Sequence, residues 1–323
     1  MITSLPTSCP NLRRITFEFT PRDPMITAAV SELLLTINRN TLQRFHVDSP
    51  LTEEATEVIC KISNLRCLRV VIGRPGPLPA LVLPNLTAID VEYDDNRSWL
   101  QGFRGATLGK LSSITFRSKS SSVGDFFETF GSVALSTSIP ATLSKLKFRT
   151  SHPWRPNYRL LLPFTKLKRL DIGFSCGHDC LSTLDDDVIS DLARAMPNLE
   201  TLRLGAAPCH IPASVTFTGL SALAYHCLCL SRLCIHFRLV GFDPPEISQS
   251  TSTIPRANCA LTDLQVGCIT VPGESTSMVA VALHRIFPRL ETISRGNIWW
   301  EKDSGWEKVA REINCRVIYR KLW

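Results

Sequence analysis

The sequence lacks the features that direct a chain to or across a membrane. No run of apolar residues approaches the roughly 18 that a membrane-spanning helix needs, and residues 1–6 contain no basic stretch followed by an apolar one. We therefore expect a cytoplasmic or nuclear protein that does not contact a membrane. The 12 cysteines fit this expectation, because most of them lie within apolar patterns, as Cys227 and Cys234 do, where a reduced thiol behaves as a small apolar side chain.

Motifs of nucleophilic and metal-dependent enzymes are also missing. Neither Gly-x-Ser-x-Gly nor His-Glu-x-x-His occurs. Residues 102–110 have some likeness to a phosphate-binding loop, but Arg104 stands where the spacing requires Gly, and Leu111 stands where Ser or Thr must follow Lys110. Since no nucleophile can be paired with a base, we predict that the protein is not an enzyme and needs no cofactor.

Possible metal ligands occur in two loops. They are Cys176, His178, Asp179 and Cys180 in one, and Cys209 and His210 one repeat later. Their spacing matches no standard zinc signature, and such residues occur more often in ordinary loops. We therefore predict no metal site.

The positive charge of the chain is concentrated in one region. The formal net charge is +7, and residues 101–171 contain 12 Lys and Arg against 3 Asp and Glu, which leaves 24 basic and 26 acidic residues elsewhere. Apolar residues make up 44% of the chain, which is enough for a continuous core. The charge distribution predicts one basic surface on an otherwise balanced protein.

One pattern, Leu-x-x-Leu-x-Leu with conservative replacements, recurs along the whole chain. Its first leucines are Leu12, Leu42, Leu65, Leu86, Leu111, Leu143, Leu167, Leu199, Leu230, Leu261 and, in a degenerate last copy, Leu290. Alternation within the motif places the leucines on one face of a strand and the intervening residues on the other. The leucines should therefore form the core, and the intervening residues should line a concave face.

Successive first leucines lie 21 to 32 residues apart, a spacing typical of repeats that combine a strand with a helical or irregular return segment. The pattern predicts an α/β leucine-rich-repeat solenoid, a horseshoe with a parallel concave sheet and an irregular helical convex side. We expect a single domain over residues 1–323 with about eleven repeats. Residues 73–79 should form an extended link, and the Pro-, Ser- and Thr-rich stretch 241–258 a surface loop.

Helical periodicity appears between the strands. It is clearest at 185–196, where acidic residues at the start suit the helix dipole, an apolar stripe follows, and Pro197 ends the helix. Similar helices are expected at 26–38, 52–62, 123–134, 216–228 and 278–287. Residues 297–323 should form a C-terminal cap, with an amphipathic helix from Trp306 to Ile313 followed by residues 315–319.

The chain resembles the fungal F-box leucine-rich-repeat proteins, which are substrate adaptors of cullin-RING ubiquitin ligases. The segments that carry the resemblance are 161–167, 184–189, 196–202, 218–224 and 233–237. It covers nearly the whole chain as repeats and implies a repeat scaffold that recognises a protein partner. Such proteins usually begin with an F-box, which docks on the ligase adaptor subunit, whereas here the first repeat starts by Leu12. The ligase adaptor subunit is therefore expected as a partner only if an F-box precedes this sequence.

The repeat geometry also predicts a candidate site. Stacking the strands in parallel brings exposed cations together on the concave face: Arg117, Lys145, Lys147, Arg149, Arg169 and Arg203. Asp171 partly neutralises this patch, and a solvated face is the alternative to a binding site. As a site, it would bind an acidic or phosphorylated protein partner. The other candidate partner is nucleic acid, indicated by the pI of about 8.9 and by Trp154 and Tyr158 in the adjoining loop.

Overall fold

The computed structural model describes residues 8–18, 24–72, 81–93, 106, 108–118, 124–135, 139–151, 156–174, 184–205, 214–239, 259–267, 271–295 and 305–321. The chain divides into two compact units, unit 1 (Met1–His152) and unit 2 (Pro153–Trp323), and each is described by itself. The predicted link at 73–79, the loop at 241–258, Trp154 and the possible zinc ligands at 176–180 and 209–210 lie outside the described residues. The single-domain organisation stays a prediction.

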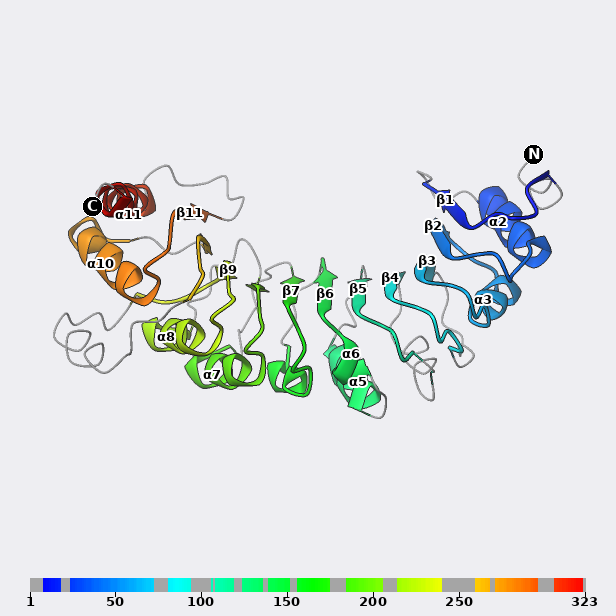
Figure 1. The fold of residues 1–323 in the computed structure, drawn as a ribbon, viewed down its shortest axis with the longest axis horizontal. Coiled ribbons are helices and arrows are strands. Elements are labelled where there is room, and N and C mark those ends of the chain that lie inside the picture. The colour runs from blue at the N-terminus through cyan, green and yellow to red at the C-terminus, as the bar shows by residue number, and fades with distance from the viewer. Residues whose placement is uncertain are drawn as a thin grey trace. The chain divides into compact units, whose positions relative to one another are not determined.

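Unit 1 is a stack of parallel strands that pair in chain order. The strands are β1 (Arg14–Phe17), β2 (Arg44–Pro50), β3 (Cys67–Ile72), β4 (Ala88–Tyr93), β5 (Ser113–Ser118) and β6 (Lys145–Thr150). Helices in the connections are α2 (Pro24–Thr36), α3 (Glu53–Ile59), α5 (Gly124–Leu135) and α6 (Ile139–Thr142). Figure 1 shows α2 and α3 together on one side of the strands β1 to β3, which leaves the other side of the sheet open.

Unit 2 repeats the same arrangement. Its parallel strands are β7 (Arg169–Phe174), β8 (Thr201–Leu204), β9 (Arg232–Ile235), β10 (Asp263–Val266) and β11 (Thr292–Arg295). The connecting elements are η2 (Tyr158–Leu161), α7 (Asp186–Ala195), α8 (Phe217–His226), η3 (Gly273–Ser275) and α10 (Thr276–Ile286), and α11 (Trp306–Lys321) follows the last strand. Both units are therefore leucine-rich-repeat solenoids of strand-plus-return repeats, as the sequence pattern predicts.

The repeat motif sets both the register and the core. Residues at the second position of the motif are direct partners on neighbouring strands, as Leu68 and Ile89 are, and Ile89 and Ile114. These three side chains are at most 3% exposed. The strand positions predicted from the eleven motif copies are thus confirmed, because a period of two residues leaves the apolar set only one face on which it can be buried.

The predicted helices are confirmed with boundaries shifted by at most three residues. Helix α7 begins where the acidic cluster indicates: the Asp185 carboxylate caps its first turn by accepting a hydrogen bond from the Val188 backbone N–H at 2.8 Å. At its end, Arg194 lies in the last turn, where a cation suits the dipole. None of the helices within the described ranges is long and apolar enough to cross a bilayer.

The C-terminal helix is longer than the sequence pattern predicts. Helix α11 continues from Trp306 through residues 315–319 and ends at Lys321, and it packs against α10 and β11. Trp306 is 3% exposed and contacts the ring of Phe237 edge-on, with centroids 5.9 Å apart. This packing buries the start of α11 against unit 2, and the role of residues 297–323 as a cap stays a prediction.

The half-buried carboxylate of Asp186 links two successive repeats of unit 2. Asp186, in the first turn of α7, accepts hydrogen bonds from the backbone N–H of Thr216 at 2.7 Å and of Gly219 at 3.0 Å, and from the Thr216 hydroxyl at 2.6 Å. Gly219 leaves room for this contact, because a Cβ there would lie 2.6 Å from the carboxylate oxygen. One acidic side chain therefore satisfies free N–H groups at the start of α8.

Candidate binding surface on the open face of unit 1

The open face of unit 1 consists of the strand residues that alternate with the buried apolar ones. Its members are Arg14, Thr16, Arg44, His46, Asp48, Cys67, Arg69, Ala88, Asp90, Glu92, Ser113, Thr115, Arg117, Lys145, Lys147 and Arg149, all of them charged or polar except Ala88. These side chains stand in rows across the strands, because residues at the same motif position are register partners.

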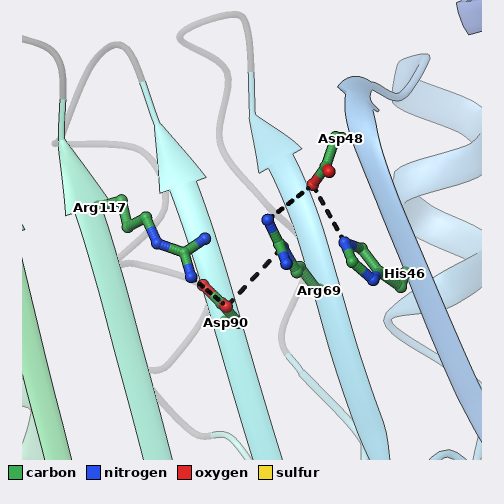
Figure 2. Close-up of polar contacts among 5 residues, drawn as sticks. All are labelled: His46, Asp48, Arg69, Asp90 and Arg117. Atoms are coloured by element: carbon green, nitrogen blue, oxygen red, sulfur yellow. Dashed lines mark hydrogen bonds and ion pairs between the residues drawn. The ribbon is translucent and has the colours of Figure 1, made fainter. Parts of the chain in front are cut away.

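A ladder of alternating charges crosses the middle of this face (Figure 2). Arg69 lies between two carboxylates, with Nη2 3.0 Å from Asp48 Oδ1 and Nε 3.8 Å from Asp90 Oδ2. Arg117 reaches Asp90 from the other side at 2.8 Å, and the imidazole of His46 lies 3.1 Å from Asp48. Each arginine of the ladder is therefore compensated by a neighbouring carboxylate.

Asp90 is the central member of the ladder. Its Oδ2 binds Arg117 at 2.8 Å, whereas its Oδ1 is buried and has no hydrogen-bond partner among the described residues. Burial raises the pKa of Asp90 above its ordinary value, and the positive charges of Arg117 and Arg69 oppose that shift. Arg117, a predicted site residue, thus lies on the open face, but its guanidinium is bound within the protein.

Strand β6 carries two lysines whose charge no carboxylate compensates among the described residues. Lys145 and Arg149 are exposed and Lys147 is half-buried. Within the described part of the chain, the side chains of Lys145 and Lys147 form no ion pair or hydrogen bond. Arg149 is the direct register partner of Arg117, so two guanidinium-bearing residues stand side by side on β5 and β6. Opposed like charges destabilise a sheet, so β6 is the part of this face best suited to an anion.

Two predicted site residues belong to unit 2. Arg169 is exposed and pairs in register with Thr201. Arg203 is half-buried and is the register partner of Asp171 and Cys234. The structure thus brings Arg117, Lys145, Lys147 and Arg149 together in unit 1, whereas Arg169 and Arg203 lie on the strands of unit 2.

Burial suppresses ionisation of several thiols of unit 2. Burial raises the pKa of Cys234, while a hydrogen bond and the charge of Arg203 act in the opposite direction. Burial also raises the pKa of Cys227 to about 12, and its Sγ lies 3.6 Å from the carbonyls of Ala193 and Met196. Cys227 fits the core as predicted, whereas Cys234 stands on the outward side of β9 and is only half-buried. No group of His, Cys, Asp and Glu that could hold a metal occurs within the described residues.

Sequence reasoning missed two features of this face. One motif position, four residues after the first leucine, carries the ladder residues His46, Arg69 and Asp90 and, on β6, Lys147. Arg14, Arg44 and Lys145 share another, two residues after it. Comparing charges position by position across the repeats, rather than counting cations in one region, would have found both sets.

Comparison with known proteins leaves the family open. No known family model matches the chain, and no curated protein matches its sequence. Among solved structures, a chain of the crystal structure of the Rad7 and Elc1 complex in yeast is similar over 94% of this chain and 82% of that chain, with 14% sequence identity and a TM-score of 0.39. The resemblance to F-box leucine-rich-repeat proteins stays a prediction, and the function has to be inferred from this chain's own residues.

Proposed function

We propose that this protein is an interaction scaffold that binds an acidic or phosphorylated protein segment on the open face of unit 1, with strand β6 as the anchor. One observation carries the proposal. Lys145 and Lys147 are uncompensated among the described residues, whereas Arg69 and Arg117 on β3 and β5 are paired with carboxylates. Lysine supplies a point charge to an anion, and an arginine such as Arg149 can bind a carboxylate or phosphate through two parallel hydrogen bonds.

A scaffold role is favoured over catalysis. Burial raises the pKa values of four thiols, those of Cys60, Cys227, Cys234 and Cys259, which is the opposite of what a nucleophilic cysteine needs. Repeat stacking builds a long, regular surface of side chains on rigid strands, which suits recognition of an extended partner. We therefore propose that the protein is not an enzyme.

Nucleic acid is the weaker candidate partner. Asp48, Asp90 and Glu92 stand on the same face as the cations, and a continuous polyanion laid across the strands would pass over them. Tyr158 does not offer a stacking platform, because it is 2% exposed. A protein segment can place its acidic side chains selectively against β6.

The resemblance to the F-box leucine-rich-repeat family gives the proposal a wider setting. Within it, the repeats would be the substrate-recognition region of a ubiquitin ligase adaptor. This part rests on the packing motifs at 184–189 and 196–202, and the ligase adaptor subunit is a partner only if an F-box precedes this sequence. Co-purification of the ligase adaptor subunit with the product of the complete gene tests it, and failure to co-purify would count against the ligase role alone.

Charge reversal tests the anchor directly. We expect the triple variant Lys145→Glu, Lys147→Glu and Arg149→Glu to bind labelled acidic and phosphoserine peptides about tenfold or more weakly than wild type. The control variant reverses the exposed cations Arg39, Lys61 and Lys110 instead, which changes the net charge equally. Equal binding by the two variants would show that β6 is an ordinary solvated strand.

The same variants separate the classes of partner. Treating the phosphoserine peptide with phosphatase measures the contribution of the phosphate. The salt dependence of binding to single-stranded RNA measures the number of phosphate contacts. RNA binding that is tighter than peptide binding and is lost in the β6 variant would replace the protein partner by nucleic acid.

A further inference from the structure

A second, unassigned pair of cations stands at the other end of the open face of unit 1. Arg14 on β1 and Arg44 on β2 are direct register partners, and both are exposed. Among the described residues, the Arg14 side chain makes one polar contact, a 3.4 Å hydrogen bond from Nε to the hydroxyl of Thr16. The side chain of Arg44 forms no ion pair or hydrogen bond in the part of the chain that the structure describes. Two unneutralised arginines side by side on adjacent strands repel each other, so an external anion would stabilise them.

Arg44 and Lys145 lie in one row across the sheet. Register pairs connect Arg44 to Cys67, Cys67 to Ala88, Ala88 to Ser113, and Ser113 to Lys145. Four strand spacings of about 4.8 Å place the two cationic ends about 19 Å apart. The row between the ends carries no charge, so an acidic ligand finds attraction only at the two ends.

The two neighbouring rows of the face carry carboxylates between the two ends. They contain the ladder, in which Arg69 and Arg117 are paired with Asp48 and Asp90. A ligand with negative charge along its whole length would lie beside these carboxylates and would be repelled there. The charge pattern therefore fits a ligand that is negative at two points and neutral between them.

We propose that the open face of unit 1 binds an extended protein segment across strands β1 to β6, with one acidic group at Arg14 and Arg44 and another at Lys145 and Lys147. The β6 end of this site rests on the function proposed above. An extended chain advances about 3.3 Å per residue, so about six residues separate the two acidic groups. Because the groups belong to one segment, the second contact forms at high effective concentration and strengthens the first.

Designed peptide probes test the two-point site. The two-ended probe has an Asp-Asp pair at each end of a neutral Gly and Ser spacer of about five residues, which matches the row. A single-ended probe has one pair replaced by Ser-Ser, and a short probe has a spacer of about two residues, too short to reach both ends. Binding of each labelled probe to the full chain is measured by fluorescence anisotropy at low salt.

We expect the two-ended probe to bind about tenfold or more tightly than the single-ended and short probes. The double variant Arg14→Gln and Arg44→Gln should weaken the two-ended probe to the level of the single-ended one. Lys145→Gln with Lys147→Gln should do the same. The control, Arg39→Gln with Lys61→Gln, removes equal charge outside the row and should leave the preference intact.

The outcomes distinguish the two proposals. If the Arg14 and Arg44 variant binds like the control while the β6 variant is weakened, the two-point site is wrong and the β6 anchor stands. If the β6 variant binds like the control, both are wrong. Equal binding of the two-ended and short probes to wild type would also overturn the two-point site, because the spacing would then have no effect.

Discussion

Replacing Asp186 by alanine should destabilise unit 2 far more than the same change one residue later. Asp186 accepts three hydrogen bonds from the start of α8, at 2.7, 3.0 and 2.6 Å. Asp187 stands in the same first turn of α7 but is exposed, and within the described residues its side chain forms no hydrogen bond or ion pair with α8. Both changes remove an acidic residue from the helix start, so the difference between them isolates the link between repeats.

The size of the effect follows from the three contacts. Hydrogen bonds to a charged group contribute about 1.5–3 kcal/mol each, but Thr216, which supplies two of the three donors, is only half-buried, so these two donors regain some hydration when the carboxylate is removed. We expect a loss of about 2–4 kcal/mol for Asp186→Ala, and below about 1 kcal/mol for Asp187→Ala. For a unit of this size, each kcal/mol lowers Tm by about 2–4 °C.

Gly219 gives a second, independent measure of the same link. A Cβ at this position would lie 2.6 Å from Asp186 Oδ1 and 3.1 Å from Val215 Cγ1. Gly219→Ala should therefore cost about 1–3 kcal/mol in wild type and clearly less in the Asp186→Ala background, where the carboxylate is gone. Urea unfolding of wild type, Asp186→Ala, Gly219→Ala and the double variant, together with amide exchange of α8, measures the coupling between the two positions. Additive effects, or equal stability of the Asp186 and Asp187 variants, would refute the reasoning.

Three further predictions concern the register, the thiols and the ladder. Leu202→Asp places a charge at a side chain that is 1% exposed and should lower the free energy of unfolding by about 4 kcal/mol or more. The neighbouring Arg203→Gln, on the open side of the strand, should lower it by about 1 kcal/mol or less. Comparable thermal melts of the two variants would contradict the register. Iodoacetamide at about pH 8 should label the exposed Cys229 and leave Cys227, whose pKa burial raises to about 12, unmodified until the protein unfolds; mass spectrometry of the labelled native protein checks this. Because burial raises the folded-state pKa of Asp90, its stabilising contribution is present below the unfolded-state pKa and is lost as pH rises through the folded-state pKa. The stability of wild type relative to Asp90→Asn should therefore fall as pH rises above the ordinary Asp pKa of 3.8, and a rising difference would show that the arginines outweigh burial.

The strands and the core follow from the sequence alone because the repeat motif contains its own register. Each copy has apolar residues at fixed positions, so aligning Leu86 with Leu111 also aligns Ile89 with Ile114, and the structure pairs them in that way. The helices follow for a similar local reason: a capping residue such as Asp185 and an apolar stripe lie within one segment. The length of α11 did not follow from the sequence. Packing against α10 and β11 stabilises that helix, and such tertiary contacts cannot be read from the segment itself.

The placement of charged residues on the open face was also predictable, but their pairing was not. The motif puts Arg117 beside Glu92 in register, yet its guanidinium binds Asp90, which lies diagonally across on β4. Long side chains reach diagonal as well as direct neighbours, and the choice depends on burial and on which other charges compete for the same carboxylate, as Arg69 does for Asp90. The sequence by itself therefore determined where each charge stands, because the backbone repeat is periodic. Only the tertiary structure decided which cations remain uncompensated, because that depends on side-chain contacts between residues more than 20 positions apart, as the 27 positions between Asp90 and Arg117 illustrate.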